Sequence, residues 1–155
     1  MAHRGIASLA VAAIVSFLLL SSFDPQFSLL HIYESSIYIV LLFLLIYEGE
    51  KWAYLLGIIA PAIWVVLVSA SNFGGILRQV GRVFHFQRPD FPANLIGAVT
   101  MIISISMVGA CLYRWNRDRW GFDHVWRALS TILFAVAVYY AVLVFWFSHM
   151  VMAGS

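Results

Sequence analysis

Long apolar runs alternate with short polar connections along the whole chain. Each run has about 20 predominantly apolar residues, the length that an α-helix needs to cross the hydrocarbon core of a bilayer. The runs are unbroken and lack the residue-by-residue alternation that is typical of membrane β-barrels. The pattern therefore predicts an all-α polytopic membrane protein with five transmembrane helices, at about residues 6–23, 29–47, 52–70, 93–113 and 125–147.

A further helix is indicated between the third and fourth runs, at about residues 73–86. Apolar residues recur there at helical spacing on one face, while Arg78, Arg82 and His85 fall on the other. This arrangement is typical of a helix that lies in the plane of the membrane surface. Pro89 helps to end it, because the residue before a proline disfavours helix. We expect a surface connector, or alternatively a basic site for a phosphate or an acidic lipid headgroup.

The composition agrees with a chain whose solvent is largely lipid. Of the 155 residues, 63% are hydrophobic and 10% are charged, whereas ordinary soluble domains carry about 25% charged residues. The single cysteine, Cys111, excludes an internal disulfide. We expect one membrane domain over residues 1–155. The first helix is expected to be retained rather than removed as a signal peptide, since no small-x-small cleavage site precedes the sequence FDPQF.

The positive charges are distributed unevenly between the two ends of the predicted bundle. With the N-terminus in the cytoplasm, six Lys and Arg residues fall on the inner side and three on the outer side. The inner residues are Arg4, Lys51, Arg114, Arg117, Arg119 and Arg127, and the outer ones are Arg78, Arg82 and Arg88. The positive-inside rule therefore predicts an inner N-terminus and an outer C-terminus. We expect a prokaryotic plasma membrane.

Arginine and tryptophan alternate in the segment YRWNRDRWGFDHVWR. Tryptophan suits the headgroup layer, and arginine suits anionic lipid. We expect Arg114, Arg117 and Arg119 to contact lipid on the inner side. A nucleic-acid partner is not indicated, because lipid also explains the tryptophans.

One constellation of polar residues interrupts the apolar pattern. His31, Glu34, Ser35 and Tyr38 occur at positions i, i+3, i+4 and i+7, which places them within an arc of about 100° on a helix. Ionisable groups in a membrane helix usually face the bundle interior, because exposure to lipid is costly. The last predicted helix carries further polar residues at helical spacing, and the outer loop carries one more. We therefore expect an outer-face cluster of His31, Glu34, Ser35, Tyr38, His85, Tyr139 and His149.

Three interpretations of this cluster remain open from the sequence. It is a structural hydrogen-bond network, a metal or haem site, or a site for protons, a quinone or another ligand. Imidazole and carboxylate groups suit iron, zinc, copper or manganese, and the candidate metal ligands are His31, Glu34, His85 and His149. A single HxxE is nevertheless a weak motif, since carboxylate-bridged metal sites use more acids.

Two local features predict how the helices pack. Small residues repeat on one face of the fourth run and also at Ser8, Ala12 and Ser16 of the first, so both stripes predict close helix contacts. Pro61 lies inside the third run and removes a backbone bond to Gly57, which predicts a kink or local unwinding there.

No recognised catalytic motif is present. The chain lacks a phosphate-binding loop, a GxSxG and an HExxH, so an enzyme is not favoured. We expect a small structural or accessory subunit of a larger membrane complex, for which energy conversion is one role. The expected partners are membrane lipids and other membrane subunits. The alternatives are a redox protein that binds a metal or haem at its outer face, and a protein that binds a lipid or a quinone.

Overall fold

The computed structural model describes residues 2–47, 50–117 and 122–153. These residues form five α-helices, a short 3₁₀ helix and no strand. All five α-helices are long and apolar enough to cross a bilayer. The elements in chain order are α1 (Ala2–Phe23), η1 (Pro25–Phe27), α2 (Ser28–Tyr47), α3 (Glu50–Phe84), α4 (Pro92–Arg117) and α5 (Phe122–Ala153). The predicted all-helical architecture with five apolar helices is confirmed.

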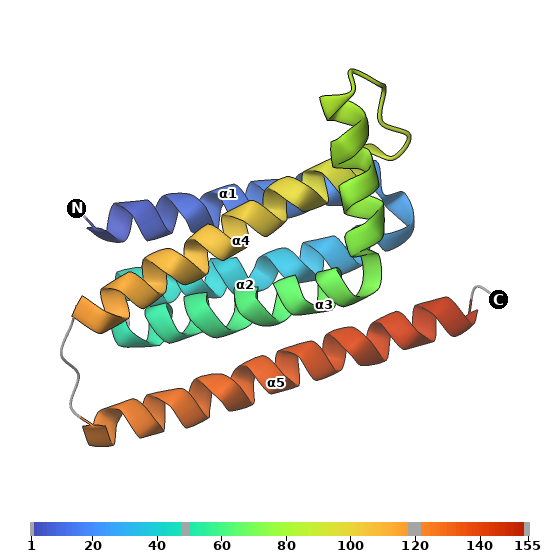
Figure 1. The fold of residues 1–155 in the computed structure, drawn as a ribbon. Coiled ribbons are helices and arrows are strands. Elements are labelled where there is room, and N and C mark those ends of the chain that lie inside the picture. The colour runs from blue at the N-terminus through green and yellow to red at the C-terminus, as the bar shows by residue number, and fades with distance from the viewer. Residues whose placement is uncertain (1, 48–49, 118–121, 154–155) are drawn as a thin grey trace.

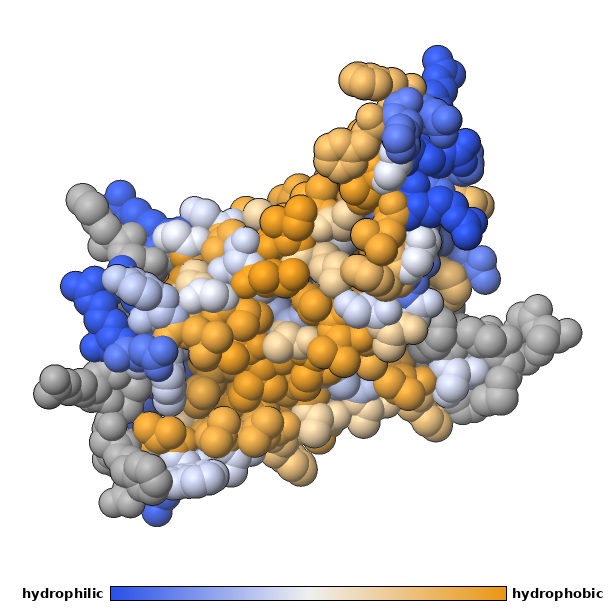
Figure 2. All heavy atoms as spheres, viewed as in Figure 1, coloured by the Kyte–Doolittle hydropathy of each residue, from blue (hydrophilic) through white to orange (hydrophobic). Residues whose placement is uncertain are grey.

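The helices lie side by side and alternate in direction, so α1 begins at one end of the bundle and α5 ends at the other (Figure 1). Helices α1 to α4 pack against one another, with α4 lying against both α1 and α3. Helix α5 packs mainly on α3 and touches α2 at a few points, so it forms one edge of the bundle. Figure 2 shows a continuous apolar surface between two ends where hydrophilic residues gather.

The small-residue stripe of α4 packs as predicted, but that of α1 does so only in part. On α4, Gly97, Thr100, Ser104, Met107 and Cys111 are all buried. On α1, Ser16 is buried, Ala12 is half-buried and Ser8 is exposed. Most of the buried face is made by Ile6, Ala10, Ala13, Phe17 and Leu20, so the predicted stripe lies at the edge of the packing face and enters it only at Ser16.

Helix α3 breaks at Asn72 rather than at the proline. Asn72 has non-helical backbone angles (φ −141°, ψ 15°), whereas the chain around Pro61 stays helical. After this break, residues 73–84 turn away from the bundle axis and run across its end (Figure 1). We call residues 73–84 the arm. The Asn72 side-chain amide donates to Asn94 Oδ1 at 2.9 Å, which ties the break to the first turn of α4.

The arm is amphipathic, as the sequence predicts, but only part of its apolar face is covered. Ile76 and Gln79 are buried against the bundle, while Leu77 and Phe84 are 53% and 77% exposed. Figure 2 shows apolar spheres on the side of the arm that faces the apolar belt and hydrophilic spheres on the opposite side. A helix with this distribution is suited to a membrane surface.

Candidate functional site

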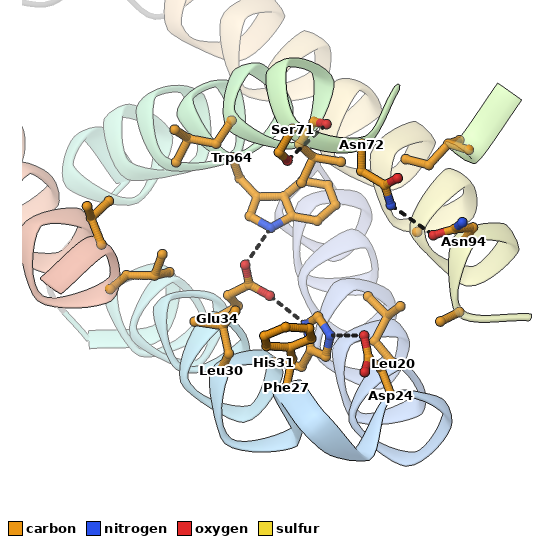
Figure 3. Close-up of a pocket in the computed structure, with 17 residues that line it drawn as sticks. Leu20, Asp24, Phe27, Leu30, His31, Glu34, Trp64, Ser71, Asn72 and Asn94 are labelled. Atoms are coloured by element: carbon orange, nitrogen blue, oxygen red, sulfur yellow. Dashed lines mark hydrogen bonds and ion pairs between the residues drawn. The ribbon is translucent and has the colours of Figure 1, made fainter. Parts of the chain in front are cut away.

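A cavity of about 380 Å³ lies at the end of the bundle where the arm begins. Residues from α1, η1, α2, α3, α4 and α5 line it, so it sits where all the helices converge. Most of its walls are apolar side chains such as Leu30, Leu67 and Leu143. Polar side chains also line it, and Figure 3 shows Glu34 between Trp64 and His31, with the pair of Asn72 and Asn94 at another side of the space.

Glu34 is the centre of the polar wall. It is 9% exposed, and its two carboxyl oxygens each contact a different residue. Oε2 lies 2.9 Å from His31 Nδ1, one turn earlier on the same helix. Oε1 accepts a hydrogen bond of 3.0 Å from Trp64 Nε1 on α3. An ionised carboxylate only accepts hydrogen bonds, so an ionised Glu34 requires the proton of this contact to sit on Nδ1.

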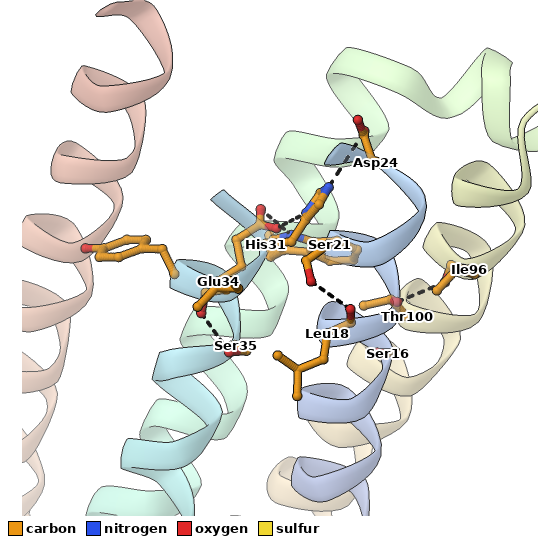
Figure 4. Close-up of polar contacts among 12 residues, drawn as sticks. Ser16, Leu18, Ser21, Asp24, His31, Glu34, Ser35, Ile96 and Thr100 are labelled. Carbon is orange, nitrogen blue, oxygen red and sulfur yellow. Dashed lines mark hydrogen bonds and ion pairs between the residues drawn. The ribbon is translucent and has the colours of Figure 1, made fainter. Parts of the chain in front are cut away.

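His31 lies between two carboxyl groups. Its Nδ1 faces Glu34, and its Nε2 lies 3.8 Å from Asp24 Oδ2, which is too long for a hydrogen bond. Figures 3 and 4 show Asp24, His31 and Glu34 in this order along the cavity wall. Asp24 reaches His31 because α1 ends at Phe23 and Pro25 starts a new short helix. Asp24 has non-helical backbone angles (φ −128°, ψ 76°), in keeping with the disfavoured helical conformation before a proline, so the helical path is interrupted at this residue.

Aromatic rings pack beneath the polar residues of the cavity wall. Phe17 makes an edge-on contact with Trp64, with ring centroids 5.2 Å apart. It also contacts Tyr38 at 5.6 Å. Phe17 is fully buried, so it holds the indole of Trp64 in the orientation that reaches Glu34.

The predicted polar cluster divides into separate groups. His31 and Glu34 line the cavity, whereas Tyr38 lies outside it and has its hydroxyl 3.3 Å from Ser104 Oγ on α4. The Ser35 hydroxyl donates to Ile32 O of its own helix. His85 is exposed just beyond the arm and does not line the cavity.

Tyr139 joins α5 to α2 rather than lining the cavity. Its ring stacks on Tyr33, with centroids 4.7 Å apart and planes 10° from parallel. The hydroxyl of Tyr139 donates to Tyr33 O at 3.0 Å, and the hydroxyl of Tyr33 donates to Tyr139 O at 3.2 Å. The side chain of His149, which the sequence places in the cluster, lies outside the described residues.

The described residues contain no group of three or more His, Cys, Asp or Glu that could hold a metal ion. The geometry of the cavity wall gives the reason. Asp24 and Glu34 approach opposite ring nitrogens of His31, so the three side chains do not converge on one point. The candidate ligand His85 lies elsewhere on the surface, as described above.

The arginines that the sequence assigns to lipid or anions are placed as follows. Arg78 and Arg88 are exposed, but Arg82 forms an ion pair with Asp90 in the loop that follows the arm. Gln79 accepts a hydrogen bond from the backbone N–H of the same aspartate. Arg114 and Arg117 lie in the last turn of α4. Arg119 is outside the described residues.

Five polar residues of the site were not among the sequence candidates: Asp24, Trp64, Ser71, Asn72 and Asn94. Asp24 lies in a connection between two apolar runs, where a charged residue is ordinary. Trp64 is one of six tryptophans, and no pattern marks it as the one that faces a glutamate. The two asparagines flank the amphipathic segment, and that position is the one signal that could have singled them out.

No protein-family model, curated protein or solved structure matches this chain. Function is therefore inferred from the chemistry and placement of the cavity residues.

Proposed function

We propose that this chain is an integral membrane protein that binds a small, largely apolar molecule with a polar head in the cavity described above. Five helices of sufficient length and an apolar belt between polar ends support insertion in a bilayer. The arm then lies at the membrane surface, with its apolar side toward the hydrocarbon. The positive-inside rule favours the orientation in which the cavity opens at the outer side.

The observation that carries this proposal is the combination of an apolar cavity with a preassembled polar wall. A volume of about 380 Å³ falls within the range of about 300–1,000 Å³ that is typical of small-molecule sites. Buried polar groups are costly in a bilayer unless they have partners. Glu34 is nonetheless placed at the edge of an open space, held by His31 and Trp64. This arrangement suits recognition of one polar head by a few fixed groups, with the apolar walls accommodating the rest of the molecule.

The test is to identify small molecules that remain with the protein after purification in mild detergent. Ala93 lines the cavity, so Ala93→Phe is designed to fill it. Val99 lies on the same helix and is 53% exposed at the surface of the bundle, so Val99→Phe is the matched control. We expect mass spectrometry of extracts to detect a lipid, quinone or other amphiphile with the wild type and with Val99→Phe, and much less with Ala93→Phe. Equal amounts in all three proteins, or no bound molecule in any, would overturn the proposal.

A second function, as an accessory subunit of a larger membrane complex, is favoured by the position of α5. This helix packs only on α3 and α2 among the described elements. It leaves large side chains such as Phe134 and Val138 exposed to 72% and 47%. A helix of another membrane subunit is the occupant that would suit this face.

Site-specific photo-crosslinking tests the subunit role. A photoreactive residue at Phe134 should give one discrete adduct with a membrane protein that also migrates with the chain in native gels. The same probe at Ile102, 65% exposed on α4, is the control and should give none. Only lipid adducts at both positions, with the protein migrating as a monomer, would exclude the subunit role.

A further inference from the structure

The charges around the cavity are unbalanced. Two acidic side chains, Asp24 and Glu34, line it together with His31, and none of the described lining residues is a lysine or an arginine. Of the arginines on the arm and in the loop after it, Arg82 is paired with Asp90, and Arg78 and Arg88 are exposed to solvent outside the cavity. With both carboxyl groups ionised, the cavity is net negative whichever protonation state His31 has. An anionic head would therefore meet repulsion that no lysine or arginine of the described lining offsets.

An aromatic side chain lies beside these two acids in the cavity. The ring of Trp64 lines the same space, next to the carboxyl group to which its N–H donates. Tryptophan is the side chain that attracts cations most strongly through its ring face, and the attraction is stronger where water is excluded. The Glu34 carboxylate also keeps acceptor capacity beyond its two bonds, since each of its oxygens can accept more than one hydrogen bond.

We propose that the cavity selects a lipophilic organic cation, meaning an amine or quaternary ammonium group attached to an apolar body. This inference rests on the proposed binding function and names the charge of the ligand. The cationic group lies against Asp24, Glu34 and the Trp64 ring, and the apolar body lies against the leucine side chains of the cavity. The acids supply long-range attraction, while the indole stabilises a cation that cannot donate a hydrogen bond.

Three probes of similar shape and different charge test the selection: benzyltrimethylammonium, its uncharged carbon isostere neopentylbenzene, and benzylsulfonate. Binding to the full chain in uncharged-lipid nanodiscs is measured by equilibrium dialysis, and the signal with Ala93→Phe is subtracted as partition into lipid. We expect the cation to bind at least about tenfold more tightly than the neutral isostere, and the anion to bind more weakly than both. Equal binding of cation and neutral probe, or tighter binding of the anion, would overturn the charge selection while leaving the cavity function intact. Failure of all three to exceed the Ala93→Phe signal would count against the binding function itself.

Amide variants separate charge from shape. Asp24→Asn and Glu34→Gln each remove one acid with little change in volume, and Glu50→Gln removes an acid at the start of α3, at the end of the bundle away from the cavity. The two cavity variants are expected to weaken benzyltrimethylammonium about threefold to tenfold each and to leave neopentylbenzene within twofold, while Glu50→Gln changes neither. Retained binding of the neutral probe shows that the variant is folded. An unchanged cation-to-neutral ratio in both cavity variants would overturn the assignment of these acids.

Discussion

At the scale of single residues, the hydrogen bond from Trp64 to Glu34 is the contact most open to test. Trp64→Phe keeps an aromatic ring next to Phe17 but removes the N–H that Glu34 Oε1 accepts. The buried carboxyl oxygen then lacks a protein donor. We expect the free energy of unfolding to fall by about 1–2 kcal/mol, the range for a lost interhelical bond that leaves a buried acceptor unpaired. Thermal unfolding in one detergent, followed by circular dichroism, measures it.

The matched control is Trp146→Phe, since Trp146 is 41% exposed and no hydrogen bond of its indole is part of the site. It should change the midpoint little. A second variant, Glu34→Gln in the Trp64→Phe background, measures the coupling between the two residues. Additive effects of the two substitutions would mean that the bond contributes nothing measurable to stability.

The sequence predicts the contacts of this site that lie within one helix, but it does not predict the contacts between residues far apart in the chain. The pairing of His31 with Glu34 is local, because a spacing of three residues places both on one helical face. The partners Trp64 and Asp24 are not local. Their placement depends on how α3 is rotated about its axis and on the turn at Pro25, and neither is encoded by spacing within one helix. The same limit explains why Tyr38 faces Ser104 instead of the cavity.

At the scale of helices, Gly57 sets how closely α3 approaches α4. A Cβ atom added at Gly57 would lie 2.6 Å from Cys111 Sγ and 3.0 Å from a methyl group of Leu41. Gly57→Ala therefore overpacks the contact, and we expect a loss of about 1–3 kcal/mol in the free energy of unfolding. Denaturation in mixed detergent micelles checks the value.

Two further variants make the packing prediction specific. Cys111→Ala removes the sulfur atom that the new Cβ would meet, so Gly57→Ala should cost less in that background than in the wild type. Gly109→Ala is the control on the same pair of helices, because a Cβ there meets nothing within 4 Å. Equal costs of Gly57→Ala with and without Cys111 would contradict the proposed contact.

The arm depends on a second glycine. A Cβ at Gly75 would lie 2.3 Å from Asn72 Oδ1 and 3.2 Å from Asn94 Nδ2, so Gly75→Ala should disrupt the bond between these asparagines. Because this bond anchors the break in α3 to α4, we expect faster hydrogen exchange across residues 73–84. Gly81→Ala is the control, since nothing lies within 4 Å of its Cβ position. Unchanged exchange in Gly75→Ala would show that the asparagine pair does not hold the arm.

The sequence predicts where the helices begin and end better than it predicts where a helix bends. Apolar runs give the five helices to within a few residues at most ends, because polar connections interrupt the apolar pattern close to where each helix ends. The break at Asn72 was not foreseen, since Pro61 is the stronger local signal. Inside a packed helix the bond lost at Pro61 is tolerated, whereas Asn72 gains a partner in Asn94 by leaving the helical conformation.

At the scale of the whole molecule, the proposed insertion in a membrane makes the orientation of the chain decide which side the cavity faces. Cys111 is fully buried, so the wild type should react little with a membrane-impermeant maleimide. Gln87→Cys introduces a thiol in the exposed connection after the arm, and Asn116→Cys introduces one at the exposed end of α4. With an inner N-terminus, intact cells should label Gln87→Cys at once and Asn116→Cys only after permeabilisation. The reverse order would place the cavity at the cytoplasmic side and require an inner source for its ligand. Labelling of both variants in intact cells would mean that the six-to-three distribution of basic residues does not fix one orientation.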